Sequence, residues 1–278
     1  MATSPPKSND QYTSTYYNDN QCFSFAGQFI SEERFKEWSS TTLQVLFPML
    51  SSNLLSNNFI SYNHDKDFDK FKNKKILVIG GGPSTNDLSF DNIDVDYIFS
   101  ANNFFLNEKL ANKKIDIAMV GAEVDTNSEE FISYVDKFQP WLGFEIHGKW
   151  KSLDYNRYVN EHLYNSYSKL FCMQSRYYGC VGVGHRLLVL AMALQAKEIH
   201  FIGIDGPGGM INGNHAFEGN KINLPKLPKH LNESNAEEIF LNAYKDFLTH
   251  VKEDIKYEGK LINLGKDNPN NIIPEYIC

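Results

Sequence analysis

The sequence has few features of membrane, secreted or nucleic-acid-binding proteins. Its four cysteines include no Cys-x-x-Cys pair, and we expect them to be free thiols in a reducing cytoplasm. Its longest strong apolar run, Leu187 to Leu194, is far shorter than the roughly 18 residues that a membrane span needs. The N-terminus lacks the apolar core of a signal peptide. We therefore expect a cytoplasmic protein without a transmembrane segment.

Positive charge is also scarce. The chain has 27 Lys and Arg against 34 Asp and Glu, which gives a net charge of −7. This balance argues against nucleic acid or an anionic membrane as the main partner. The hydrophobic content of 42% and the charged content of 22% are typical of globular proteins, and 278 residues can bury a large core.

The most informative stretch of the sequence is rich in glycine and runs from Ile76 to Ser84 (Ile-Leu-Val-Ile-Gly-Gly-Gly-Pro-Ser). Its four apolar residues predict a buried strand, and the glycines and Pro83 predict a tight turn that opens a helix. Such a junction offers backbone N–H groups to a phosphate. It is not a complete dinucleotide fingerprint, since Thr85 replaces the third glycine, nor a P-loop. A tight turn without a ligand is therefore the alternative.

The rest of the chain alternates predicted strands and helices. This alternation predicts an α/β fold with a doubly wound, mostly parallel, Rossmann-like sheet and a small N-terminal helical appendage. We expect a flexible arm at 1–20, a helical appendage at 21–70 and a Rossmann-like nucleotide-binding catalytic domain at 71–278. Within that domain, strands are predicted at 76–79, 97–100, 115–120, 141–146, 197–205 and 260–264, helices at 128–138, 186–195 and 235–252, and a lid or substrate loop at 150–178.

Several candidate binding residues follow the predicted strands, where open α/β sheets bind their ligands. Asn102 and Asn103 end the second strand, and their amides could contact a base or ribose, although an Asn-rich turn is the alternative. Asp205 ends the strand at 197–205. Gly184 precedes a helix, and the neighbouring His185 could touch a phosphate or serve in packing.

Two histidines are candidate bases, because an ordinary imidazole has a pKa near neutrality. His215 lies in a stretch from 206 to 220 with five glycines in fifteen residues, which predicts a mobile lid. His230 lies in an irregular, proline-containing segment. A solvated loop histidine is the alternative for each of them.

Two acidic motifs resemble metal sites, but we expect neither to bind a metal. The stretch from Asp65 to Asp69 resembles a calcium loop, but Lys70 and Ile76 stand where such a loop needs glycine and glutamate. The Asp94-Val-Asp96 motif precedes its strand, whereas a ligand site should lie beyond the strand's carboxyl end.

Residues 74–275 resemble the bacterial sialyltransferases of the Campylobacter type. Gly80-Gly-Gly-Pro-Ser84 is similar to their Gly-Asn-Gly-Pro-Ser loop, which holds the cytidine monophosphate of CMP-sialic acid. Residues 184–205, Ala216-Phe-Glu218 and 263–272 are similar to further segments of that family. The resemblance and the positions at strand ends together predict nucleotide binding by Gly80, Gly81, Gly82, Pro83, Ser84, Asn102, Asn103, Gly184 and Asp205.

The sequence also departs from that family. Gly81 replaces the loop asparagine, and Gly209 and His215 replace two tyrosines that assist phosphate departure. A protonated His215 would take over that hydrogen bond to the phosphate. His230 lies in the region of the family's catalytic histidine, and the basic membrane-associating tail is missing. The resemblance implies transfer from a CMP-sialic-acid-type donor to a glycan or small-molecule acceptor, with a histidine base and no required cofactor; homo-oligomerisation is left open.

Two other functions remain open at this point. The same loop resembles that of motility accessory factors and of archaeal 6-hydroxymethyl-dihydropterin diphosphokinases. This second resemblance implies Mg²⁺-dependent transfer of pyrophosphate from ATP, with Glu123, Asp125 and Asp205 as metal ligands. A non-catalytic nucleotide-binding protein on the same fold is the third hypothesis.

Overall fold

The computed structural model describes a large α/β domain. Because the predicted arm at 1–20 and His230 lie outside the described residues, both stay predictions. The described residues are 24–25, 28–29, 66–90, 93–121, 124–145, 167, 169–173, 182–206, 215–217, 238, 241, 244–245, 248, 257–269 and 271–273.

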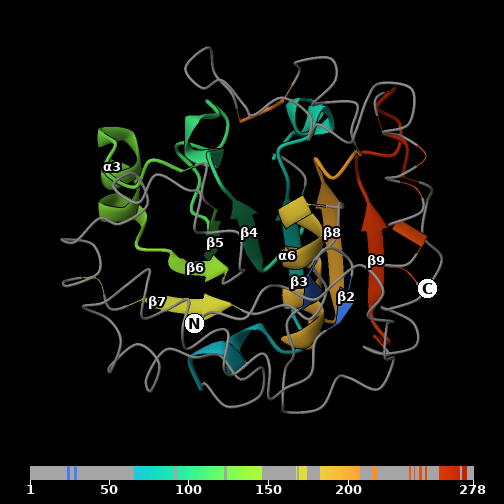
Figure 1. The fold of residues 1–278 in the computed structure, drawn as a ribbon. Coiled ribbons are helices and arrows are strands. Elements are labelled where there is room, and N and C mark those ends of the chain that lie inside the picture. Colours follow the sequence, from blue (N-terminus) through green and yellow to red (C-terminus); the bar gives the residue numbers. More distant parts are fainter. Residues whose placement is uncertain are drawn as a thin grey trace.

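The centre of the fold is a seven-stranded sheet with the order β7-β6-β5-β4-β3-β8-β9 (Figure 1). Every neighbouring pair in it is parallel, which confirms the predicted parallel α/β architecture. The strands are β3 (Lys75–Ile79), β4 (Tyr97–Ala101), β5 (Ile117–Val120), β6 (Trp141–Glu145), β7 (Leu170–Met173), β8 (Glu198–Ile202) and β9 (Lys260–Asn263).

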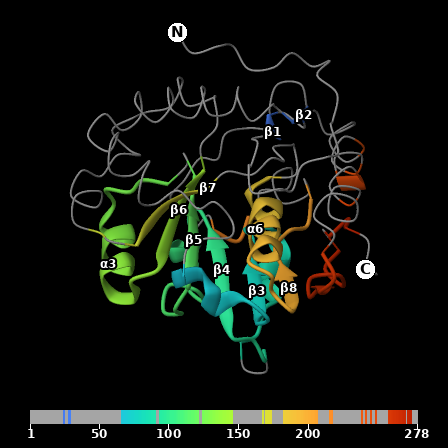
Figure 2. The same ribbon diagram turned by 90° about the horizontal axis from the view of Figure 1, so that it is seen from below.

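The central strand β3 is apolar on both sides because both faces of the sheet are covered. Ile76 and Val78 pack in one core cluster with helix α6 (Gly182–Ala193), which packs on β4, β3 and β8 (Figure 2). Leu77 and Ile79 pack in the other cluster with helix α3 (Glu129–Phe138). The alternating side chains of one strand therefore hold the two layers of the fold together.

The two helices differ in composition because their surroundings differ. Helix α3 is amphipathic; its buried face carries Phe131 and Val135, and the side chain of Ser128 caps its first turn. Helix α6 is apolar all round, and its residues from Leu187 to Ala191 are fully buried. The predicted helix at 235–252 is described at Glu238, Leu241, Tyr244, Lys245 and Leu248, which are all helical.

Some predicted elements differ from the structure. Strand β7 (Leu170–Met173) lies in the segment predicted as a lid, where aromatic and polar residues obscured a short strand. In the predicted helical appendage, β1 (Ser24–Phe25) and β2 (Gln28–Phe29) form an antiparallel pair, and η1 (Lys66–Phe71) is a 3-10 helix. The remainder of residues 21–65 lies outside the described residues. Within the described part of the chain, no helix is both long enough and apolar enough to cross the bilayer.

The helix predicted after the glycines is a short 3-10 turn, η2 (Pro83–Asp87). The Ser84 side chain bonds to Asp205, and that of Thr85 bonds to the carbonyl of Gly80. Serine, threonine, asparagine and aspartate side chains compete with helical backbone bonds in this way, which favours a turn over a helix.

An aromatic cluster at the base of the sheet provides a test of the fold. Phe71 is fully buried and its ring contacts those of Tyr97 and Phe99 at centroid distances of 4.8 and 5.1 Å. We expect Phe71→Ala to reduce the free energy of unfolding by about 3–5 kcal/mol, measured by urea denaturation. Ile132→Ala on the exposed side of α3 is the control, with an expected loss under about 1 kcal/mol. Equal losses in the two variants would contradict the described core.

Candidate functional site

The candidate site lies where the order of the strands reverses. The chain runs from β3 through β4, β5 and β6 to β7 in one direction, and then places β8 on the other side of β3. Open α/β sheets bind ligands outside the carboxyl ends of the strands at such a switch point. The glycine loop, Gly80–Ser84, follows β3, and the segment Gly203–Gly206 follows β8. The predicted loop therefore stands at the position that this fold uses for ligands.

The glycines let the loop touch the backbone that leaves β8. The N–H of Gly82 donates to the carbonyl of Gly203 at 2.8 Å. A Cβ at Gly80 would lie 2.2 Å from that same carbonyl oxygen, and one at Gly82 would lie 2.5 Å from Oδ2 of Asp205. Gly203 itself has a φ of +70°, which favours glycine. Backbone packing alone therefore requires three of these glycines.

The backbone N–H groups of the loop are mostly used inside the protein. Gly80, Gly82 and Ser84 donate theirs to Ile202, Gly203 and Asp205, and Pro83 has none. Of the four loop residues that have an N–H, Gly81 alone has no hydrogen-bond partner for it among the described residues. The sequence predicted a row of N–H groups open to a phosphate, and this expectation is wrong because the loop is fastened to β8. A phosphate at this loop would meet the N–H of Gly81.

A buried hydrogen-bond network fixes the loop. Ser84 donates its N–H to Oδ2 of Asp205 at 2.7 Å and its hydroxyl to Oδ1 at 2.5 Å. The Ser84 oxygen in turn accepts the N–H of Gly203 at 2.8 Å. Ser84 is fully buried and Asp205 is 2% exposed. Burial raises the pKa of Asp205, while the two hydrogen bonds from Ser84 act in the opposite direction. These two buried side chains hold the loop in place, and nucleotide contact by them stays a prediction.

The turn after β9 also joins the network, in addition to the segments after β3 and β8. The N–H of Ile272 donates to the carbonyl of Asp205 at 3.0 Å. Gly265 approaches Ser84 so closely that a Cβ there would lie 2.4 Å from the hydroxyl oxygen. Asn263 accepts the N–H of Gly265, and Asn271 donates to the Gly265 carbonyl, so asparagine side chains shape this turn.

His215 lies directly against the one loop residue whose N–H is not used. A Cβ on Gly81 would lie 2.0 Å from Cε1 and 2.4 Å from Nε2 of the imidazole, so the ring fills the place of a side chain at position 81. Nδ1 accepts the N–H of Phe217 at 3.3 Å, which leaves the ring proton on Nε2. Burial lowers the pKa of His215 to about 4. The ring is therefore neutral at neutral pH, which corrects the expected protonated form.

The segment that carries His215 is fastened on both sides. The N–H of Ala216 donates to the carbonyl of Gly81, and Asn107 donates its Nδ2 to the carbonyl of Ala216, both at 2.8 Å. Phe217 is 2% exposed and packs in the core. The predicted lid is thus attached to the glycine loop at 215–217, and its residues 207–214 and 218–220 lie outside the described residues.

The other candidate residues lie around the same edge of the sheet. Asn102 adopts a φ of 56°, and its Oδ1 accepts the N–H of Gly121, so it ties the ends of β4 and β5 together. Asn103 is 4% exposed and precedes the 3-10 turn η3 (Phe104–Leu106). Gly184 lets α6 approach Ile204, because a Cβ there would lie 2.9 Å from its Cγ1.

His185 has a packing role. It is fully buried, and its ring meets that of Tyr244 edge-on at a centroid distance of 5.5 Å. Full burial against Tyr244 favours the packing alternative over a phosphate contact by His185.

The residues proposed for a metal do not form a described cluster. Glu123 lies outside the described residues, and Asp125 shapes the turn before α3 by accepting the N–H groups of Asn127 and Ser128. Both carboxylate oxygens of Asp205 accept hydrogen bonds from Ser84. In the part of the chain that the structure describes, no three His, Cys, Asp or Glu residues are grouped to hold a metal ion.

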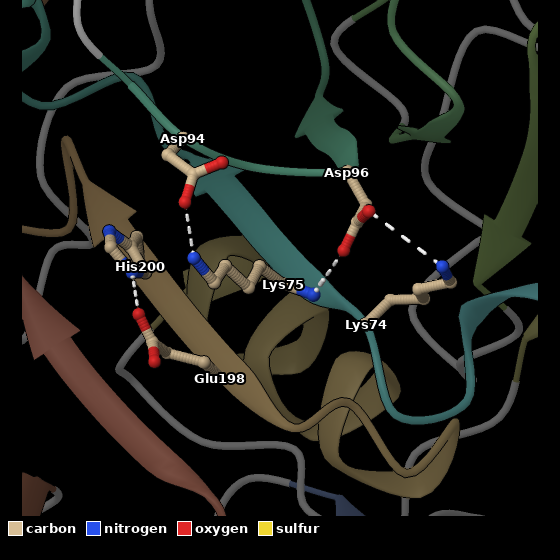
Figure 3. Close-up of polar contacts among 6 residues, drawn as sticks. All are labelled: Lys74, Lys75, Asp94, Asp96, Glu198 and His200. Carbon is tan, nitrogen blue, oxygen red and sulfur yellow. Dashed lines mark hydrogen bonds and ion pairs between the residues drawn. The ribbon is translucent and has the colours of Figure 1, made fainter.

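The Asp94-Val-Asp96 motif lies at the opposite, amino-terminal edge of the sheet (Figure 3). Asp94 pairs with the side chain of Lys75, and Asp96 accepts the Lys75 N–H at 2.9 Å and lies 3.8 Å from Nζ of Lys74. On the neighbouring strand, Glu198 pairs with His200. Both carboxylates of this motif therefore contact lysines in the described structure.

Ser84→Ala tests the network that holds the loop. The substitution leaves the N–H of Gly203 and one oxygen of Asp205 without their described partner in a fully buried place. We expect the free energy of unfolding to fall by about 2–3 kcal/mol, measured by urea denaturation. Asn86→Ala, in the same turn but exposed, should change it by less than about 0.5 kcal/mol. A loss at Ser84 no larger than that at Asn86 would contradict the network.

The low pKa of His215 predicts a pH dependence of stability. Between about pH 6.5, where the unfolded histidine binds its proton, and about pH 4, where the folded one does, unfolding takes up a proton. Stability should therefore fall as the pH is lowered through this window. Between pH 7 and pH 4.5, we expect the free energy of unfolding of His215→Gln to fall by about 2 kcal/mol less than that of the parent. His200→Gln, on the other edge of the sheet, is the control, and parallel losses in all three proteins would contradict the buried neutral ring.

Comparisons with known proteins give similarity only among solved structures. No family model matches the chain, and no curated protein matches it. The sialyltransferase CstII from Campylobacter jejuni with cytidine-5'-monophosphate is 18% identical, with 69% of this chain and 80% of that chain covered and a TM-score of 0.43. The complex of CST-II with trisaccharide acceptor and CMP is 17% identical, with 73% and 89% covered and a TM-score of 0.45. CstII from the same organism with CMP-3FNeuAc is 16% identical, also with 73% and 89% covered and a TM-score of 0.45. The similarity to motility accessory factors and pterin diphosphokinases stays a prediction.

Proposed function

We propose that this protein is a glycosyltransferase that uses a CMP-linked sugar acid of the sialic acid type as its donor. The observation that carries the proposal is the place of Gly81. Its N–H is the unused one of a glycine loop at the switch point of a parallel sheet, and the His215 ring lies against it. The resemblance of Gly80–Ser84 and residues 197–205 to sialyltransferase segments supports the choice of CMP.

The donor would bind through its phosphate at Gly81. The backbone N–H of Gly81 and the Nε2–H of a neutral His215 would both donate to an oxygen of the phosphate, since the ring lies against Gly81. Asn102 and Asn103, at the end of the adjacent strand β4, would contact the ribose or the base. Ser84 and Asp205 would keep the loop in shape without touching the nucleotide.

The transfer would exchange one bond of the sugar for another. The bond between the anomeric carbon and the phosphate oxygen breaks, that carbon bonds to an acceptor hydroxyl oxygen, and the hydroxyl proton passes to a base. The leaving phosphate gains charge in the transition state, where the two donors at Gly81 and His215 would stabilise it most. A pKa of about 4 makes His215 a poor base at neutral pH, so we assign the base role to His230.

We propose that the donor is hydrolysed slowly without acceptor and that no metal takes part. Calorimetry should give a dissociation constant for CMP at least tenfold lower than those for UMP, GMP and AMP. Release of CMP from CMP-N-acetylneuraminic acid should be unchanged by EDTA. His215→Ala should lower kcat at least tenfold, which is about 1.4 kcal/mol, and change CMP affinity less than threefold.

The control for that substitution is His200→Ala at the amino-terminal edge, which should leave both kcat and CMP affinity within twofold of the parent. Equal affinity for the four nucleotides would contradict the proposal that the donor is a CMP-linked sugar. Activity lost in EDTA and restored by Mg²⁺ would favour pyrophosphate transfer from ATP instead. CMP binding without any turnover would favour a non-catalytic nucleotide-binding protein.

A further inference from the structure

A chain of two hydrogen bonds connects the loop after β4 to the glycine loop. Asn107 donates its Nδ2 to the carbonyl of Ala216, and Ala216 donates its N–H to the carbonyl of Gly81. We propose that Asn107 is a positioning residue that holds His215 against Gly81. The placement of the ring stands on these contacts alone, whereas its effect on catalysis rests on the proposed function.

The hydrogen bond from Asn107 constrains the segment strongly, because with it both backbone polar groups of Ala216 have a partner. Ala216 is 8% exposed, and both its N–H and its carbonyl are bonded to residues far away in the sequence. Without the amide of Asn107, that carbonyl would remain buried without its described donor, which is costly. The segment would then move toward water, and His215, its immediate neighbour, would move with it.

Asn107 can fix another segment because its own loop is fixed. The rings of Phe104 and Phe105 pack edge-on against Tyr134 and Phe131 of α3 at centroid distances of 4.9 and 5.4 Å. The backbone carbonyl of Asn107 accepts the N–H groups of the next turn, and its Oδ1 accepts the N–H of Lys109 at 3.0 Å. The amide is therefore already oriented, with Nδ2 directed at Ala216.

The same loop also contacts the far end of the glycine turn. Lys109 donates its Nζ to the carbonyls of Asn86 and Leu88, which lie at the end of η2. The short segment 107–109 thus bridges the two parts of the site, η2 on one side and the His215 segment on the other. We attribute the close contact between the His215 ring and Gly81 to this bridge. The contact is so close that position 81 has no room for a side chain.

The pKa of His215 measures where the ring lies, because it depends on burial. Burial is what lowers the pKa of His215 to about 4, so a ring released into water should titrate closer to 6.5. Proton and carbon NMR of labelled histidine measures this directly, and the resonance lost in His215→Gln identifies the ring. We expect Asn107→Ala to raise the pKa of His215 by at least one unit. Asn112→Ala is the matched control in the same loop, since Asn112 is exposed and bonds only to Lys137 among its described contacts.

A second variant covers the risk that Asn107→Ala does not fold. Asn107→Ser keeps an oxygen near the N–H of Lys109, but it is too short to reach Ala216, and it should raise the pKa of the ring in the same direction. A folded variant whose His215 titrates within 0.3 unit of the parent overturns the proposal. So does an equal shift in Asn112→Ala.

Turnover measures whether the placement matters for the reaction. We expect Asn107→Ala to lower kcat for CMP release at least fivefold with CMP affinity within threefold, and to lower it less than twofold further in a His215→Ala background. An additive loss in the double variant, or an unchanged kcat beside a shifted titration, overturns the positioning role in catalysis. If the protein binds no CMP, the proposed function fails, and the titration alone still decides whether Asn107 places the ring.

Discussion

The candidate site depends on the buried hydrogen bonds between Ser84 and Asp205. They join the loop after β3 to the segment after β8, the two strands between which the sheet reverses its order. A carboxylate is expensive to bury unless it is hydrogen-bonded, and here one serine offers both its N–H and its hydroxyl. The turn after β9 adds a third segment through the carbonyl of Asp205. The loop is consequently fastened by hydrogen bonds to other segments of the protein itself.

Local patterns in the sequence predicted most of the sheet. Unbroken apolar runs such as Ile76 to Ile79 belong to strands that are buried on both faces, and the alternation of strands and helices implied parallel pairing. Strand β7 was missed because Leu170–Met173 is short and surrounded by polar and aromatic residues. The turn at η2 was predicted as a helix because the proline signal says where a helix can start and not whether side chains will compete with it.

The site was predictable only in part, for a physical reason. Glycines, prolines and strand ends are local signals, and they located the loop at residues 80–84 correctly. The use of its N–H groups by β8, the placement of His215 over Gly81 and the contact of Asn107 with Ala216 depend on residues about 110 to 135 positions apart. Asn107 carries no motif at all; it is one polar residue in a loop, and only the fold shows what it bonds to.

The missing side chain at Gly81 has a consequence for how this site can change over time. The imidazole of His215 occupies the space that any side chain at position 81 would need. A homologue that gains a side chain at 81 must therefore move or replace the ring at 215. The residue types at the two positions therefore constrain each other, although the positions lie 134 apart in the sequence. Engineering of this loop should therefore change the two positions together.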